Sequence, residues 1–327
     1  MSNFWKDLKK PIFALAPMAD VTDAAFRRII AKYGKPDVIF TEFVSTDGLV
    51  HPDARERLLL DFMYDESEHP IVAQIFGATP EHFFEVAKLV RELGFDGVDI
   101  NMGCPERKIQ KQNACAALIQ NPKLAKEIVV ATKEGAGDLP VSVKTRIGYN
   151  TNEIETWIPA ILEADPVALT IHARTKKEMS KVPAHWDAVK RAVEIRDALG
   201  SEALIIGNGD VKDRKEAKEK VRETGVDGVM IGRGIFGNPW LFSQETNRED
   251  LSLEERFRVM IEHTRLFEEL IGRAKNFALM KKHYKAYVEG FDGAKELRIK
   301  LMEAKDADEV ERITLEFLTQ NSLPENA

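Results

Sequence analysis

The sequence predicts a parallel α/β barrel of the (β/α)8 (TIM) type, followed by a small all-helical C-terminal domain. Eight short apolar or β-branched runs recur along the chain, and stretches with helical periodicity separate most of them. Strands that are apolar on both faces and alternate with helices form parallel sheets. Eight such units in about 240 residues match a closed barrel. The runs cover residues 12–17, 38–45, 71–77, 97–103, 141–148, 168–175, 204–210 and 228–236.

The connections between these runs support the barrel. In residues 81–93, apolar side chains recur at steps of three and four residues, which is typical of an amphipathic helix. Residues 93–100 and 224–231 also resemble each other, as LGFDGVDI and TGVDGVMI. In each copy we expect a helix end, a glycine cap and the start of a new strand, one in each half of the barrel.

The periodicity changes after Trp240, and no further strand is predicted. Amphipathic helices are predicted instead, with breaks at Gly272, Gly290 and Gly293. We therefore expect a barrel domain over residues 1–245 and a helical domain over residues 246–327, with a frayed tail from residue 321. The four helices are predicted at residues 253–271, 276–289, 295–302 and 307–318.

Composition excludes several classes of protein. The 36.9 kDa chain has 327 residues, a net charge of −7 and two cysteines, which excludes a disulfide framework or a four-cysteine metal cluster. We predict no metal site. No apolar run is long enough to cross a bilayer, and the charged N-terminus does not resemble a signal peptide. The expected location is the cytoplasm, away from membranes.

The C-terminal helices carry a local positive charge. Residues 273–300 contain eight cations against three anions, an excess of five in an otherwise acidic protein. Such a cluster is typical of a surface that binds nucleic acid. The cations are Arg273, Lys275, Lys281, Lys282, Lys285, Lys295, Arg298 and Lys300.

In a barrel of this type, groups that act on a ligand lie at the carboxyl ends of the strands. Polar or small residues close nearly every predicted strand, among them Asn101 and, just beyond the fourth strand, Cys104. A thiol on a turn made by glycine and proline is well placed to meet a ligand. Taken alone, however, an unpaired cysteine is more often a small buried apolar residue.

The last two strand ends predict a phosphate site. Asn208, Gly209 and Asp210 close the seventh strand, and Gly232 and Arg233 follow the eighth. This corner of the barrel often binds phosphate. Glycines let the phosphate approach closely enough to accept from backbone N–H groups, and an arginine can bind it through two N–H groups and a positive charge. The alternative is a pair of tight turns with an exposed arginine.

Three further polar residues follow apolar runs. Lys144 and His172 lie at the ends of predicted strands, where an amine could hydrogen-bond an electron-rich ring and an imidazole could contact ring oxygen or phosphate. Gln74 has donors and acceptors suited to the polar edge of a flavin or pyrimidine. Each residue alone would more often be a rim lysine, a core histidine or a loop cap.

Together these segments resemble the tRNA-dihydrouridine synthases, flavin enzymes that reduce a uridine ring in RNA. The resemblance spans the barrel in order, and its Asn-x-Gly-Cys-Pro element is close to diagnostic for the family. Residues 280–283 (MKKH) and 290–293 (GFDG) also resemble the helical RNA-binding domain of that family. The matching barrel segments are residues 16–28, 41–42, 74–77, 99–105, 143–146, 170–175, 207–210 and 230–234.

The resemblance implies a role for each matching residue. Cys104 matches the proton donor of the family, while Asn101 and Arg146 match positions that contact the target uracil. The residues that match FMN-binding positions are Pro17, Met18, Ala19, Gln74, Lys144, His172, Asn208, Gly209, Asp210, Gly232 and Arg233.

This chain also departs from the family pattern. Cys115 and Asp20 stand where glycine is usual, and Ala173 replaces the glycine of a His-Gly-Arg-Thr element. Residues 179–182 (MSKV) replace a frequent Met-Tyr-x-Gly, which removes a ring that could pack on the substrate. These departures affect which nucleotide is recognised, and leave the acid and the flavin contacts in place.

The activity implied by the resemblance is reduction of the C5=C6 bond of uridines in RNA, with tRNA favoured, to 5,6-dihydrouridine. NADPH is favoured over NADH as electron donor, and we expect a monomer that binds RNA through its basic helices. Two alternatives remain open. An FMN barrel acting on a free pyrimidine or another small molecule would not need the basic helical domain, and a non-catalytic RNA-binding relative would not need Cys104, Lys144 or His172.

Overall fold

The computed structural model describes residues 3–321 and contains a barrel of parallel strands. The hydrogen-bonded order is β1-β9-β8-β7-β6-β5-β4-β2, and β3 also pairs with β4. A bridge between Ala14 and Val38 joins β1 to the residue before β2 and nearly closes the barrel. The strands are β1 (Ile12–Leu15), β2 (Ile39–Phe40), β3 (Val44–Ser45), β4 (Ile71–Phe76), β5 (Gly97–Asn101), β6 (Val141–Arg146), β7 (Ala168–His172), β8 (Leu204–Asn208) and β9 (Gly228–Ile231).

The eight predicted runs are all confirmed as barrel strands. The second run, residues 38–45, forms two short segments, β2 and β3, which both pair with β4 and are separated by Thr41, Glu42 and Phe43. The other seven strands end one to five residues before the predicted limits, where the chain turns into the loops of the rim.

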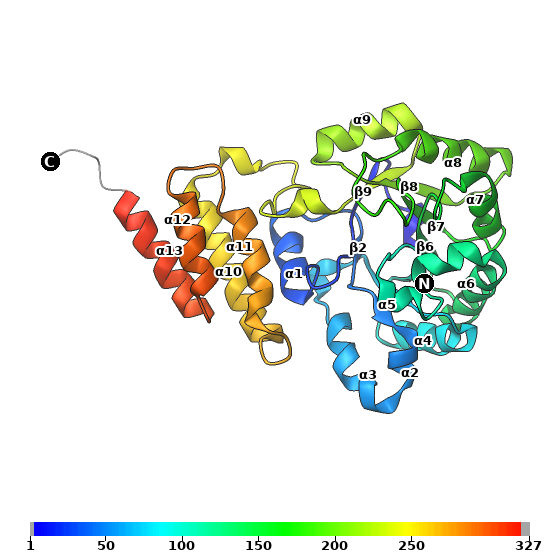
Figure 1. The fold of residues 1–327 in the computed structure, drawn as a ribbon, viewed down its shortest axis with the longest axis horizontal. Coiled ribbons are helices and arrows are strands. Elements are labelled where there is room, and N and C mark those ends of the chain that lie inside the picture. The colour runs from blue at the N-terminus through cyan, green and yellow to red at the C-terminus, as the bar shows by residue number, and fades with distance from the viewer. Residues whose placement is uncertain (1–2, 322–327) are drawn as a thin grey trace.

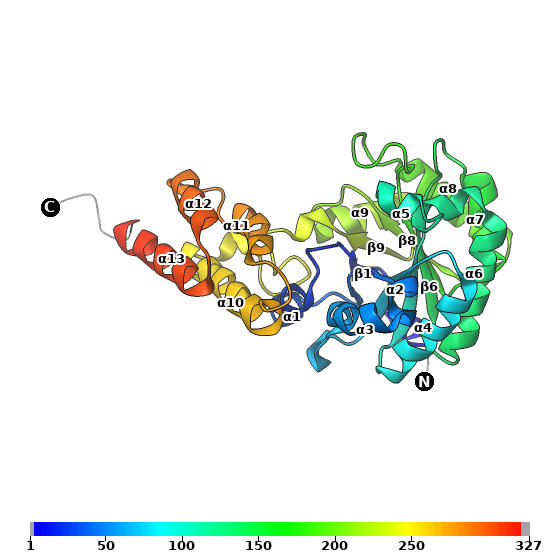
Figure 2. The same cartoon turned by 60° about the horizontal axis from the view of Figure 1, so that its bottom comes forward.

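Helices surround the strands (Figures 1 and 2). The series α4, α6, α7, α8 and α9 packs in chain order around the outside. The barrel helices are α1 (Ala24–Tyr33), α2 (Thr46–Val50), α3 (Pro52–Leu59), α4 (Pro80–Glu92), α5 (Arg107–Gln110), α6 (Pro122–Ala136), α7 (Ile154–Leu162), α8 (Trp186–Ala198) and α9 (Arg214–Thr224). Short 3-10 helices are η1 (Phe4–Lys6), η2 (Leu60–Phe62), η3 (Glu66–Glu68), η4 (Cys115–Gln120), η5 (Arg233–Ile235), η6 (Arg248–Asp250) and η7 (Phe277–Met280).

The two similar segments adopt the predicted conformation. Gly94 follows α4 with φ +81°, and Gly225 follows α9 with φ +75°. This left-handed conformation ends a helix at little cost only when the residue is glycine. In both places the chain then enters a strand, β5 or β9.

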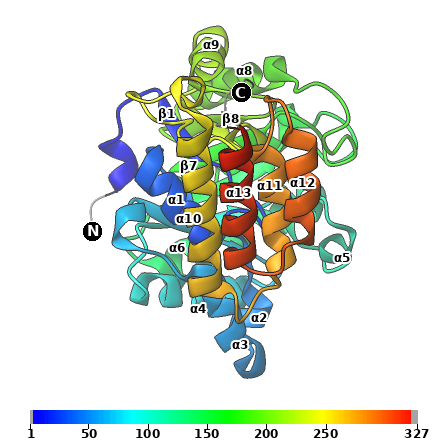
Figure 3. The same ribbon diagram turned by 90° about the vertical axis from the view of Figure 1, so that its left-hand side faces the viewer.

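The C-terminal region is helical, as predicted, and lies beside the barrel (Figures 1 and 3). Its helices are α10 (Leu253–Ile271), α11 (Lys281–Tyr287), α12 (Ala294–Glu303) and α13 (Ala307–Asn321). The helix predicted at residues 276–289 is shorter, because the Asn276 side chain caps a separate 3-10 turn, η7. The predicted frayed tail falls almost wholly outside the described residues.

The two regions have separate apolar cores. One lies in and around the barrel, and the other is built by side chains of α10–α13 such as Phe257, Phe267 and Leu301. Helix α1 belongs to the barrel and packs against α10, with Ile29 between Trp240 and Val259. The division at residue 245 stays a prediction. No helix within residues 3–321 is long and apolar enough to cross a membrane.

Candidate active site

The carboxyl ends of the barrel strands surround a cavity of about 570 Å3. Because all the strands are parallel, the loops that follow them meet at this one end. The cavity is lined by nine of the eleven residues predicted to bind the flavin: Pro17, Met18, Lys144, His172, Asn208, Gly209, Asp210, Gly232 and Arg233.

The predicted phosphate corner is compact and charged. Gly209 has φ +135°, and a Cβ atom there would lie 3.0 Å from the Cβ of Ala184, so only glycine fits without strain. Asp210 forms ion pairs with Arg174 and with Arg233, the latter at 2.8 Å. These two arginines therefore share one carboxylate, which leaves excess positive charge for an anion.

Arg174 was not among the predicted site residues. Its side chain is buried, donates from Nε to the Val182 carbonyl over 2.6 Å and lines the cavity. The available signal was its position two residues after His172 at the same strand end. β7 ends at His172 and the chain turns there, because the Arg174 N–H donates to the His172 carbonyl over 2.7 Å.

Lys144 and His172 face the same cavity as Arg174. Burial and the charges of Arg146, Lys144 and Arg174 hold the pKa of His172 well below its usual value, so the imidazole is neutral at pH 7. Burial and the charge of Arg146 lower the pKa of Lys144 to about 8. Within residues 3–321, the Lys144 amine has no hydrogen-bond or ion-pair partner. A partly buried, unpartnered amine beside an anion-binding corner is the feature expected of a ligand contact.

Gln74 and Ala19 do not line the cavity. Ala19 is exposed on the loop after β1. The Gln74 side chain is fully buried, donates to Asp99 Oδ2 over 2.6 Å and accepts from Asn101 Nδ2 over 2.9 Å. Asp99, which also accepts from Ser142 Oγ, is a buried carboxyl whose pKa burial raises to about 6. This network was not predicted, because it depends on the register that places Gln74 of β4 opposite Asp99 of β5.

Asn101 and Arg146 hold the cysteine loop. The Asn101 Oδ1 atom accepts from the backbone N–H groups of Gly103 and Cys104, each at 3.0 Å. Arg146 donates from Nε to the Gly103 carbonyl over 2.6 Å and from Nη1 to the carbonyls of Thr175 and Met179. Within the described chain no partner is found for Arg146 Nη2, which leaves one donor group of this buried guanidinium for a ligand.

The two cysteines have different environments. Cys104 is partly exposed, whereas Cys115 is fully buried and has φ +55°. Hydrogen bonds from the Cys115 thiol and from the Glu106 N–H, together with the charge of Arg146, lower the pKa of Cys104 to about 7, against the opposing effect of burial. Burial raises the pKa of Cys115. The description of a small buried apolar residue therefore fits Cys115, and Cys104 has the features of a reactive thiol.

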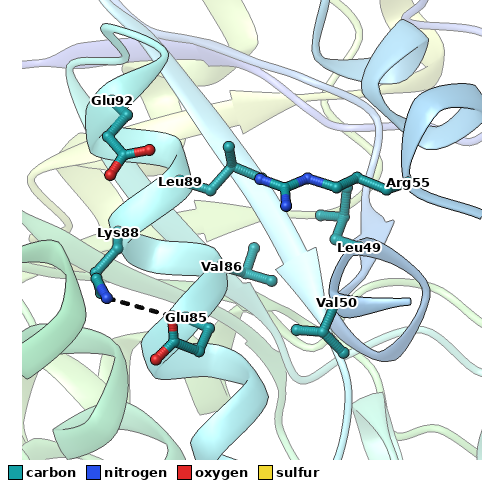
Figure 4. Close-up of a pocket in the computed structure, with 8 residues that line it drawn as sticks. All are labelled: Leu49, Val50, Arg55, Glu85, Val86, Lys88, Leu89 and Glu92. Atoms are coloured by element: carbon teal, nitrogen blue, oxygen red, sulfur yellow. Dashed lines mark hydrogen bonds and ion pairs between the residues drawn. The ribbon is translucent and has the colours of Figure 1, made fainter. Parts of the chain in front are cut away.

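A second hollow lies away from the rim, between α4 and the α2–α3 pair (Figure 4). It has a volume of about 260 Å3 and contains none of the predicted site residues. The described residues also contain no group of three or more histidine, cysteine or acidic side chains able to hold a metal ion.

The fold and the rim define a barrel enzyme with a basic, glycine-lined cavity at the end of the barrel where the Cys104 loop also lies. Residues 14–323 match the family described as dihydrouridine synthase (Dus), and the chain belongs to this family. A probable tRNA-dihydrouridine synthase of Staphylococcus aureus (strain Mu50) is 42% identical over 97% of this chain and 96% of its own. A probable tRNA-dihydrouridine synthase 2 of Bacillus subtilis (strain 168) is 41% identical over 96% of each chain.

Solved structures agree on the fold. Histamine dehydrogenase from Rhizobium sp. 4-9 superposes with a TM-score of 0.54 at 16% sequence identity, over 78% of this chain and 48% of that chain. At this level of identity the match supports the barrel alone.

Proposed function

We propose that this protein reduces the C5=C6 bond of specific uridines in RNA, with tRNA as the favoured substrate, using FMN and NADPH. The observation that carries the proposal is that the Cys104 loop, which follows β5, and the basic cavity lie at the same end of the parallel barrel. Membership of the dihydrouridine synthase family supports the reaction class, and the names of the relatives support tRNA.

The residues of the cavity fit a flavin mononucleotide. Gly209 permits close approach of a phosphate, which Arg174 and Arg233 would bind as charged donors. Neutral His172 and the free amine of Lys144 would contact the ring system. Bound FMN would supply the hydride that adds to C6 of the uracil, with NADPH as the source of electrons.

The chain itself would supply the proton and the charge stabilisation. Addition of hydride at C6 requires a proton at C5, and the Cys104 thiol would donate it. The Nη2 group of Arg146 would stabilise negative charge on a uracil carbonyl during this step. Asn101 would act by holding the loop that carries the thiol, because its amide oxygen accepts from two loop N–H groups. This differs from the direct uracil contact that the resemblance implied.

RNA would bind through part of the basic cluster. Arg273, Lys285, Lys295 and Lys300 are exposed, and no partner is found for them within residues 3–321. We propose that they contact RNA phosphates, and that the protein acts as a cytoplasmic monomer. The target nucleotide must leave its stack to reach a site at the barrel rim.

The test is a reaction with purified components. Protein reconstituted with FMN should oxidise NADPH and form dihydrouridine in unmodified tRNA transcripts, measured by mass spectrometry of nucleosides. Cys104→Ala should retain bound FMN and NADPH oxidation while dihydrouridine formation falls by about two orders of magnitude. Protein that never binds FMN would contradict the proposal. Reduction of free uracil with no activity on RNA would favour the small-molecule alternative.

A further inference from the structure

Two lysines of the basic cluster point inward to the barrel. Lys275 Nζ lies 2.7 Å from Glu42 Oε2 and 2.7 Å from Asp61 Oδ1, and its side chain is only 19% exposed. Burial opposes its charge, but the two carboxylates raise its pKa overall. Lys282 Nζ donates to the backbone carbonyl of Asp20 over 2.6 Å. Two carboxylates neutralise the Lys275 amine, and the Lys282 amine is held against the barrel through one of its three N–H donors.

Both contacts lead to one residue of the rim, Asp20. The Lys282 amine binds its carbonyl, and Glu42 Oε1 accepts from its N–H over 2.5 Å. The other oxygen of Glu42 belongs to the ion pair with Lys275. The backbone carbonyl of Asp20 is therefore held directly by Lys282, and its N–H is held by Glu42, which is itself paired with Lys275.

Asp20 needs this support because of its backbone. It has φ +56°, a left-handed conformation that is strained for a residue other than glycine. Just before it, Pro17 and Met18 line the cavity of the rim. A turn closes around them, because the Met18 N–H donates to Thr22 Oγ1 over 2.9 Å. We therefore expect the position of Asp20 to affect where Pro17 and Met18 lie in the cavity wall.

We propose that Lys275 and Lys282 are positioning residues for the flavin, acting through Asp20 and the loop of residues 17–20. The inference rests on the proposed flavin site. It assigns to two cations of the helical region a role in shaping the cofactor cavity, in place of RNA binding. The basic cluster is then divided into lysines that face the barrel and lysines that face RNA.

Lys285 provides a matched control. It lies on α11 three residues after Lys282, is exposed, and has no hydrogen-bond or ion-pair partner in the described part of the chain. Removing its charge should weaken RNA binding alone. Lys282→Arg provides a rescue, because a guanidinium can also donate to the Asp20 carbonyl.

The experiment measures the FMN dissociation constant of each full-length variant by flavin fluorescence, the tRNA dissociation constant, and the unfolding temperature. Lys282→Met and Lys275→Met should each raise the FMN constant about tenfold, which equals about 1.4 kcal/mol. Lys282→Arg should restore most of this loss. Lys285→Met should leave FMN binding unchanged and weaken tRNA binding.

Unchanged FMN binding in a folded Lys282→Met protein, together with a loss of tRNA affinity like that of Lys285→Met, would overturn the inference. The contact of Lys282 is the more exposed of the two, so its loss should disturb folding less. The Lys282→Met protein therefore tests the inference even if Lys275→Met fails to fold. Failure of the wild-type protein to bind FMN would instead overturn the proposed function, and the inference with it.

Discussion

At the scale of single residues, three neighbours lower the pKa of the Cys104 thiol. The Cys115 thiol and the Glu106 N–H donate hydrogen bonds to it and Arg146 stabilises its anion, so that its pKa falls to about 7. A thiol with that pKa is about half protonated at neutral pH and is a matched proton donor there. The pKa also makes the proposed reaction sensitive to pH.

Dihydrouridine formation should therefore fall as the pH rises above about 7, because only the protonated thiol can donate. Cys115→Ala removes the hydrogen bond that stabilises the thiolate, so the inflection in the pH–rate profile should move up by about one unit. Cys115→Ser keeps a donor and should retain the wild-type profile. Single-turnover rates between pH 6 and 9 give the measurement, and an inflection that does not move in Cys115→Ala would contradict this account of the thiol.

The sequence predicted which residues line the cavity better than it predicted their partners. Position at a strand end placed nine residues around one cavity, because parallel strands share a rim. The partners of Gln74 and Asn101 depend on which side chains of neighbouring strands lie at the same level, and register is a property of the assembled sheet. The ion pair between Asp210 and Arg174 was not predicted either, because both residues lie in loops beyond the ends of β8 and β7, and the course of these loops does not follow from the strand pattern.

At the scale of elements, α4 and α6 approach each other closely at Gly135. A Cβ atom at this position would lie 2.1 Å from the carbonyl oxygen of Phe84, so backbone would have to move. Helix propensity favours alanine over glycine by about 1 kcal/mol, but steric overlap in a packed interface costs more. Packing between α4 and α6 therefore explains why glycine rather than alanine occupies position 135.

Gly135→Ala should lower the free energy of unfolding by about 2 kcal/mol, as measured by urea denaturation. Glu134→Ala, at the exposed neighbouring position, should stay within about 0.5 kcal/mol of wild type. A stabilised Gly135→Ala protein would show that the helices separate more easily than the structure indicates.

A pair of buried histidines joins three helices. His263 on α10 and His283 on α11 have ring centroids 4.8 Å apart, and both rings contact Phe26 on α1. Burial lowers the pKa of His263 to about 3, and burial together with His263 lowers that of His283. His283 of the MKKH segment is therefore a core residue, a role that the sequence motif did not indicate.

These histidines should make the fold sensitive to acid. Below about pH 6.5 these histidines bind protons in the unfolded chain but stay neutral in the folded chain. The free energy of unfolding therefore falls as the pH falls, by up to about 1.4 kcal/mol per pH unit for each histidine. Urea midpoints measured from pH 7.5 to 5 should show this loss. His283→Gln should reduce the slope, and identical slopes in the two proteins would contradict the assignment.

At the scale of the whole molecule, the barrel strands and most C-terminal helices could be predicted because periodicity reports burial directly. Which lysines of the basic cluster contact the barrel and which are exposed could not be predicted. Lys275, Lys282 and Lys285 are alike in sequence, and only the docking of the helical region against the barrel separates those bound to Glu42 and Asp20 from the exposed one.

Binding to tRNA should weaken as salt rises, because cations that contact phosphates release counterions from the RNA. Lys285→Gln should lower affinity for all tRNA sequences and reduce the slope of log K against log salt by about one. Filter binding between 50 and 200 mM salt, roughly the range in which such contacts are lost, gives the slope. An unchanged slope would remove Lys285 from the proposed RNA surface.

The proposed activity, reduction of uridines in RNA with Cys104 as the proton donor, can be tested in cells. Dihydrouridine would be mapped across total RNA from cells that lack the gene and from the same cells complemented with wild-type protein or Cys104→Ala. Specific sites should be lost on deletion, return with the wild-type protein and stay unmodified with Cys104→Ala. An unchanged map after deletion, or full restoration by Cys104→Ala, would contradict it.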